Sequence, residues 1–187
     1  RQANSRIMAS GPVPAILDLQ NPGGYWGEPG RFYADKYRGT VWTLLLLAEL
    51  GADPLDARVQ KACEFILENA RDPQSGGFAY ERSAKSGTGL ASCVIPCLTG
   101  NMVYALIRLG YGGDSRVQAA IKWITDFQRA DDGDGAPEGP MYERFEMCWG
   151  RHTCHMGAAK AFKALAAVPP ADRNPAVEAK TASALKA

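Results

Sequence analysis

The stretch GTVWTLLLLAELG at residues 39–51 decides the fold, because two related stretches follow it in the chain. They are GNMVYALIRLG at residues 100–110 and GAAKAFKALAAVP at residues 157–169, so the blocks begin 61 and 57 residues apart. Each block is apolar nearly all round and ends near Gly51, Gly110 or Pro169, which is typical of a helix enclosed on several sides. A repeat of this period predicts stacked helical hairpins, with these helices as their inner layer.

A second block follows each of the first at a matching distance. The second blocks read DPLDARVQKACEFI (53–66), GDSRVQAAIKWI (113–124) and NPAVEAKTASAL (174–185). Asp53, Asp114 and Asn174 are the predicted capping residues of these helices. Apolar residues in the first two recur at three- and four-residue intervals, which buries one face only. We therefore expect the second blocks to form an outer layer.

A short motif lies between hairpins, where residues 20–26 read QNPGGYW. It resembles the Q-x-x-x-G-x-W motif of squalene and oxidosqualene cyclases, and degenerate copies begin at Gln74 and Gln128. Together with the pattern of inner and outer helices, almost the whole chain resembles the prenyltransferase and squalene cyclase repeat family. In that family the motif tightens the turn between hairpins. The resemblance therefore implies structural roles for Gln20, Gly24 and Trp26.

The resemblance also implies an all-α fold of a particular kind. Residues 1–187 are expected to form a single domain, a partial α/α toroid of about three hairpins plus an N-terminal helix at residues 7–19. Complete toroids of the family have about six hairpins, so we expect the chain to belong to a longer toroid. An open arc leaves apolar flanks exposed, which predicts a homodimer as the other way to cover them.

The acid that starts cyclisation in class II terpene cyclases has no counterpart here. Those enzymes resemble one another in a D-x-D-D-T-A stretch that opens an inner helix and protonates the substrate. The same register in this chain reads IPCLTGN at residues 95–101. Asp131, Asp132 and Asp134 lie in a connector instead, where a solvated turn or a calcium loop is the favoured interpretation. Protonation-initiated cyclisation is not expected, and whether the chain is an enzyme stays open.

Cysteines and histidines gather at the starts of the second and third inner helices. Zinc takes four sulfur or nitrogen ligands, and the predicted ligand pool is Cys97, His152, Cys154 and His155, with Cys93 and Cys148 in reserve. The stretch RHTC at residues 151–154 resembles the Y-H-T-C segment that supplies a zinc-bound histidine in prenyltransferase β-subunits. Two other interpretations stay open: small buried packing residues, or a thiol activated at a helix N-terminus.

Three aromatic residues, Trp42, Tyr104 and Trp149, are candidates for lining a cavity, with core packing as the alternative. Lys160 and Lys163 are interpreted as solvated. The leading hypothesis is a protein that binds a hydrophobic or isoprenoid ligand, with zinc as the candidate cofactor. The alternative is a non-catalytic helical scaffold or binding module that presents a concave surface.

The composition argues against several classes of partner. Lys and Arg number 21 against 20 for Asp and Glu, so no bulk charge favours nucleic acid or an anionic membrane. The longest apolar stretch, residues 41–48, is far shorter than the ~20 residues that a membrane-spanning helix needs. The odd number of cysteines, five, and an N-terminus without a signal-peptide pattern predict a cytoplasmic location.

Overall fold

The computed structural model describes residues 2–130, 138–143, 148 and 153–184. Within them the chain is helical, and its extended pairing is limited to three isolated β-bridges, which confirms the all-α prediction. The α-helices are α1 (Gln2–Ala9), α2 (Pro12–Asp18), α3 (Thr40–Leu50), α4 (Ala57–Asn69), α5 (Pro96–Leu106), α6 (Ser115–Phe127), α7 (Pro140–Glu143), α9 (His155–Ala167) and α10 (Pro175–Ala184). Short helical turns are η1 (Pro29–Arg31), η2 (Lys36–Arg38), η3 (Ala91–Cys93), η4 (Ile107–Tyr111) and η5 (Pro170–Asp172). No helix in these residues is long and apolar enough to cross a membrane.

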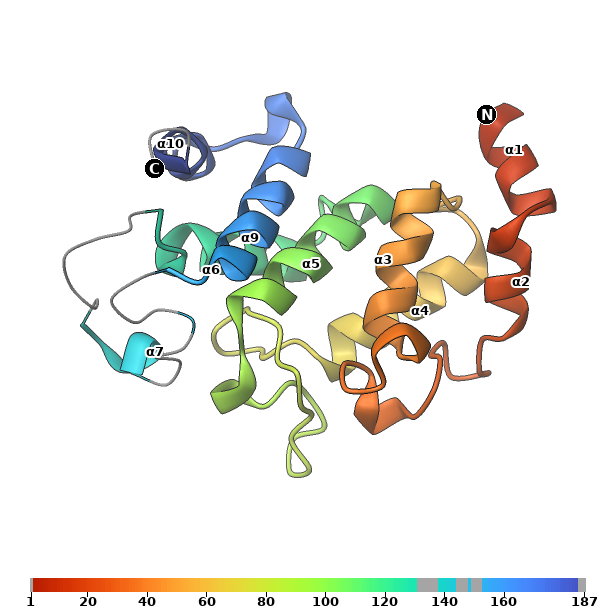
Figure 1. The fold of residues 1–187 in the computed structure, drawn as a ribbon, viewed down its shortest axis with the longest axis horizontal. Coiled ribbons are helices and arrows are strands. Elements are labelled where there is room, and N and C mark those ends of the chain that lie inside the picture. Colours follow the sequence, from red (N-terminus) through yellow and green to blue (C-terminus); the bar gives the residue numbers. More distant parts are fainter. Residues whose placement is uncertain (1, 131–137, 144–147, 149–152, 185–187) are drawn as a thin grey trace.

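The larger helices lie in two layers. Helix α5 packs between α3 and α9, and Figure 1 shows these three side by side. Helix α4 contacts α3, α6 contacts α5, and α10 contacts both α9 and α6. Each layer sends fully buried side chains into the core between them, among them Leu44, Ile66, Leu106, Ile124 and Leu165. The apolar blocks of the sequence therefore form one layer and the second blocks form the other.

Side-chain caps fix where the outer helices begin. The Oδ1 atom of Asp114 accepts the N–H of Arg116 at 2.7 Å, and Asn174 Oδ1 accepts a backbone N–H at the start of α10 at 2.9 Å, as predicted. The prediction for Asp53 was wrong. Helix α4 is capped by Asp56, whose Oδ1 accepts the N–H of Arg58 at 2.8 Å, while Asp53 forms a turn before the helix.

The turns that join the hairpins share one geometry in two repeats. Gly24 has a φ of +89°, and a Cβ there would lie 2.6 Å from the carbonyl oxygen of Lys61 in α4. Gly76 has a φ of +87°, and its Cβ would lie 2.8 Å from the carbonyl oxygen of Ala119 in α6. Both positions need a residue that tolerates positive φ and lacks a side chain. Each turn is therefore seated directly on the next outer helix.

The aromatic residue of each turn is tied to the next inner helix. The backbone N–H of Trp26 donates to Thr40 Oγ1 at 3.1 Å, and that of Phe78 donates to Thr99 Oγ1 at 2.9 Å. The indole of Trp26 also donates to the carbonyl of Ile16 at 2.8 Å. Each turn thus bridges the two layers.

The glutamine of the motif is present in the first turn and replaced in the second. The side chain of Gln20 donates to the carbonyl of Arg58 in the first turn of α4 at 2.9 Å, so it ties the turn to that helix while Asp56 caps it. The N–H of Asn21 donates across its turn to the carbonyl of Tyr25 at 2.8 Å, and that of Asp72 donates to the carbonyl of Gly77 at 2.9 Å across a turn one residue longer. Arg71, not the predicted Gln74, therefore occupies the place of Gln20.

Two glycines set the distance between the inner helices. A Cβ on Gly100 of α5 would lie 2.5 Å from the carbonyl carbon of Lys160 and 2.6 Å from the nitrogen of Ala161 in α9. At the equivalent place in α9, a Cβ on Gly157 would lie 3.2 Å from the ring of Pro96. Helices α5 and α9 thus meet backbone to backbone at Gly100, which fixes the position of Lys160 beside the next residue of α5.

Candidate ligand-binding groove

A groove of about 750 Å³ runs across the side of α3 that faces away from the outer layer. Residues of α2 and of the turn after it border one end, and residues of α5 and α9 border the other. Binding sites for small molecules usually measure roughly 300–1,000 Å³ and are mostly apolar, with a few polar groups that orient the ligand. The groove has that size and that composition.

The floor of the groove is apolar and accessible. Trp42, Leu45 and Leu46 follow one another at helical spacing on the same side of α3. Leu46 is 47% exposed, and Leu19 at the far end of the groove is 75% exposed. Large aliphatic side chains left in water beside a tryptophan form a surface on which an apolar ligand would lose contact with water.

The ring of Trp42 is held in place by two tyrosines. Its centroid lies 6.2 Å from that of Tyr33 and 5.8 Å from that of Tyr37. The indole N–H of Trp42 donates to the carbonyl of Tyr33 at 3.4 Å. The ring therefore offers the groove a fixed flat surface.

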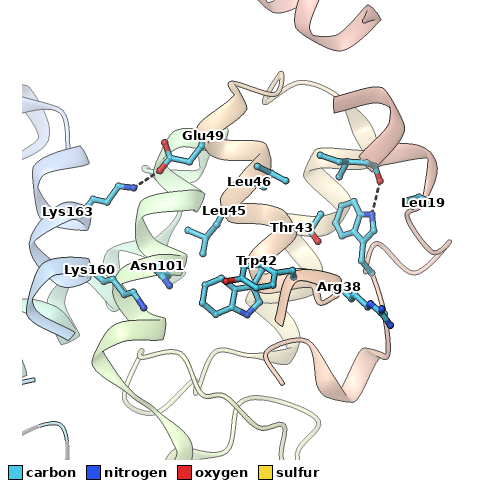
Figure 2. Close-up of a pocket in the computed structure, with 14 residues that line it drawn as sticks. Leu19, Arg38, Trp42, Thr43, Leu45, Leu46, Glu49, Asn101, Lys160 and Lys163 are labelled. Atoms are coloured by element: carbon cyan, nitrogen blue, oxygen red, sulfur yellow. Dashed lines mark hydrogen bonds and ion pairs between the residues drawn. The ribbon is translucent and has the colours of Figure 1, made fainter. Parts of the chain in front are cut away.

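The polar groups of the groove lie mainly at its α5 and α9 end. In Figure 2, Lys160 and Asn101 project side by side next to Trp42. The ammonium of Lys160 lies 5.9 Å from the centroid of the Trp42 ring, within the range of a cation–π interaction. The side chain of Asn101 is 8% exposed and, within the described residues, has no hydrogen-bond partner. Its amide nitrogen and oxygen are open to the groove, so a ligand can bond to them directly.

A second lysine at this end is already neutralised. Lys163 forms an ion pair with Glu49 of α3, and its ammonium lies 4.0 Å from the ring centroid of Tyr104. The hydrogen bond from Lys163 is the main cause that lowers the pKa of Glu49, and the same bond raises the pKa of Lys163. Both groups are therefore charged at neutral pH, and together they add no net charge to the groove.

Three cysteines lie near the same end. Cys97 is in the first turn of α5, Cys154 directly precedes α9, and the N–H of Cys154 donates to the carbonyl of Cys148 at 3.1 Å. Burial, and then the charges of the other two thiols, raise the pKa of Cys148 to about 11. Burial also raises the pKa of Cys97, although the charge of Lys160 opposes it. Burial thus outweighs the helix N-terminus at Cys97 and disfavours its thiolate.

The remaining members of the predicted zinc set are dispersed or lie outside the described residues. Cys93 is buried beside Glu81, with Sγ and Oε2 3.8 Å apart, and His155 is exposed at the start of α9. His152 lies outside the described part of the chain. Within that part, no group of three or more His, Cys, Asp or Glu residues is arranged to hold a metal ion. Cys97, Cys154 and His155 do not make a zinc site by themselves, and zinc stays a prediction that involves His152.

The groove includes some of the residues singled out in the sequence and others that were not. Trp42 lines the groove. Tyr104 is not among the lining residues, but its ring packs against the ammonium of Lys163, which is. Trp149 lies outside the described residues, as do Asp131, Asp132 and Asp134. The interpretation of Lys160 as a solvated residue was wrong, because it is half-buried over Trp42. A lysine inside a mostly apolar inner block was the signal that could have found it, and Asn101, a polar residue in the apolar block at residues 100–110, offered a similar one.

The chain has no match among protein-family models, curated proteins or solved structures. What the groove binds must therefore be inferred from its own residues.

Proposed function

We propose that this chain is a helical-repeat protein of the α/α-toroid type that holds a hydrophobic, isoprenoid-like ligand in the groove on α3. The layered order of α3, α5 and α9 over α4, α6 and α10 supports the toroid. So does the repeated turn at Gly24 and Gly76, which resembles the family motif in sequence and bridges the two layers.

The accessible apolar floor is the observation that carries the proposed ligand. Trp42, Leu45 and Leu46 face a cavity of about 750 Å³, where Leu46 is exposed and the other two are partly exposed. Each Å² of apolar surface removed from water stabilises a complex by about 25 cal/mol. A flexible hydrocarbon chain laid across α3 could cover all three residues.

Binding without chemistry fits the groove better than cyclisation does. The carboxylate among its lining residues is Glu49, and its pKa is lowered by the bond from Lys163. A general acid for protonating a hydrocarbon needs the opposite shift. The proposal is therefore a binding function, and a non-catalytic scaffold with a protein partner on the same surface is its alternative.

The groove gives a direct test with matched variants. Leu46→Asp places a charge on the groove floor, and Leu55→Asp makes the same change at a residue that is 82% exposed and outside the groove. We expect Leu46→Asp to weaken binding of farnesol by about tenfold or more, since burying a leucine contributes about 1.5–3 kcal/mol. Leu55→Asp should leave the affinity unchanged.

Calorimetric titration of the purified chain with farnesol measures both affinities. Equal affinities in the two variants would place the alcohol elsewhere and contradict the proposed groove. Light scattering on the same samples addresses the alternative. If Leu46→Asp lowers the mass of an assembly while farnesol does not bind, the surface belongs to a protein partner, with a second copy of the chain as the simplest one.

A further inference from the structure

We propose that the ligand of the groove carries a single carboxylate, which Lys160 and Asn101 hold at the end formed by α5 and α9. This inference rests on the proposed function and adds to it the chemical class of the ligand's head. It follows from three observations: an amide in the groove without a protein partner, a cation without a carboxylate partner, and the net charge of this end of the groove.

The amide of Asn101 is the first of these observations. It is one of few polar side chains in the buried set, with 8% of its surface exposed, and the exposed part lines the groove. Within the described residues no hydrogen bond satisfies it. Its amide nitrogen and oxygen are open to the groove rather than enclosed. A ligand oxygen at this end of the groove could accept a hydrogen bond from the amide without displacing a protein partner.

Lys160 supplies the positive charge. Its ammonium contacts the face of Trp42, and among the described residues it forms no ion pair with a carboxylate. The backbone contact at Gly100 keeps Lys160 next to Asn101, since α5 and α9 cannot separate or slide there without loss of packing. One ammonium and one amide N–H, side by side on two helices, match the two oxygens of a carboxylate.

The net positive charge at the α5 and α9 end of the groove favours a ligand with one negative charge over one with several. Lys163 is neutralised by Glu49, so Lys160 is the single uncompensated cation among the described lining residues at this end. Arg38 lines the opposite end (Figure 2), where the hydrogen bond from Arg31 is the main cause that lowers the pKa of Asp35 and the charge of Arg38 adds to it. A diphosphate would bring about three negative charges to one uncompensated ammonium, so most of its charge would have no partner in the groove, and a diphosphate is disfavoured.

The position of the ligand's carboxylate also sets where its hydrocarbon chain runs. Lys160 lies over Trp42, which forms the start of the apolar floor, and Leu45 and Leu46 continue from it. Leu19 lies farther along, beyond α3 (Figure 2), and Ile16 of α2 also lines the groove. A carboxylate at Lys160 therefore places a single hydrocarbon chain across α3 toward α2.

Three ligands with the same hydrocarbon chain but different polar groups test the proposed carboxylate. Farnesol, farnesoic acid and farnesyl diphosphate differ in bearing a hydroxyl, a carboxylate or a diphosphate. By calorimetry we expect the acid to bind about tenfold or more tightly than the alcohol, because hydrogen bonds to a charged group are the stronger kind. We also expect the acid to bind more tightly than the diphosphate.

Variants then assign the preference to the two residues. Lys160→Met should remove the preference for the acid over the alcohol and leave the affinity for the alcohol largely unchanged. Asn101→Leu should weaken binding of the acid more than that of the alcohol. Lys85→Met is the matched control, because Lys85 is exposed in a loop outside the groove. This variant should retain the full preference for the acid over the alcohol. Because Asn101 is buried, circular dichroism first establishes that its variant is folded, and Lys160→Met tests the proposal independently.

The outcomes are distinct. Equal affinity for acid and alcohol, or a preference that survives Lys160→Met, would overturn the carboxylate while the proposed binding of an apolar ligand stands. Tighter binding of the diphosphate than of the acid would also overturn it. Failure of all three ligands to bind would reject the proposed function and this inference together.

Discussion

Gly100→Ala should destabilise the chain by about 3 kcal/mol, because the new methyl group has no room between two helix backbones. Its Cβ would lie 2.5 Å from the carbonyl carbon of Lys160, and backbone atoms cannot turn aside as a side chain can. Inserting a methyl group into a packed core usually costs about 1–3 kcal/mol. The loss should be large even though alanine is the better helix former by about 1 kcal/mol.

Gly157→Ala is the matched control for this prediction. It adds the same methyl group at the equivalent place in α9, where its nearest neighbour is the ring of Pro96 at 3.2 Å. A ring can shift by a few tenths of an ångström, so we expect a change within about 1 kcal/mol. Urea denaturation of both variants gives the free energies of unfolding. Similar values for the two would show that α5 and α9 are not in backbone contact at Gly100.

The second large effect is expected at the turn that carries the family motif. Gly24→Ala forces a Cβ into a positive-φ conformation and brings it within 2.6 Å of the carbonyl oxygen of Lys61. The conformation alone costs about 1–2 kcal/mol. The overlap with α4 adds to it, so we expect a loss of about 3–4 kcal/mol in the free energy of unfolding.

Gly11→Ala separates the two causes. Gly11 has nearly the same φ, +86°, but no atom lies within 4 Å of the Cβ position. Its ψ of −154° places it in a region that is essentially restricted to glycine, so this variant should lose only the conformational part, about 1–3 kcal/mol. Thermal or urea unfolding of the pair measures the difference. Equal losses would mean that the turn does not need close contact with α4, and the structural role of the motif would reduce to its backbone conformation.

Much of the helical arrangement could be predicted from the sequence, since it depends on patterns that recur. The three apolar blocks became α3, α5 and α9, because a helix without a polar face can be stable only when it is enclosed. Boundaries were less certain. Asp53 and Asp56 both precede α4 and both can cap, and the local sequence does not say which one the packing of the helix selects.

The groove could be predicted only in part. Trp42 was visible as an aromatic residue in an apolar block, but its neighbours Asn101 and Lys160 come from two other repeats. Their meeting depends on the close approach of α5 and α9 at Gly100, and a glycine in a sequence does not reveal what packs against it. Short apolar and polar patterns describe one helix at a time, whereas the groove is a property of several.

That the groove takes residues from α2, α3, α5 and α9 has a consequence for how the chain unfolds. In repeat proteins each unit contacts only its neighbours, so units can open one after another. A ligand that lies across α3 and reaches Lys160 touches separate units at once, and its binding free energy is lost when any of them opens. Saturation with ligand should therefore couple the hairpins, so that the bound chain melts as a single cooperative unit while the free chain frays from its ends.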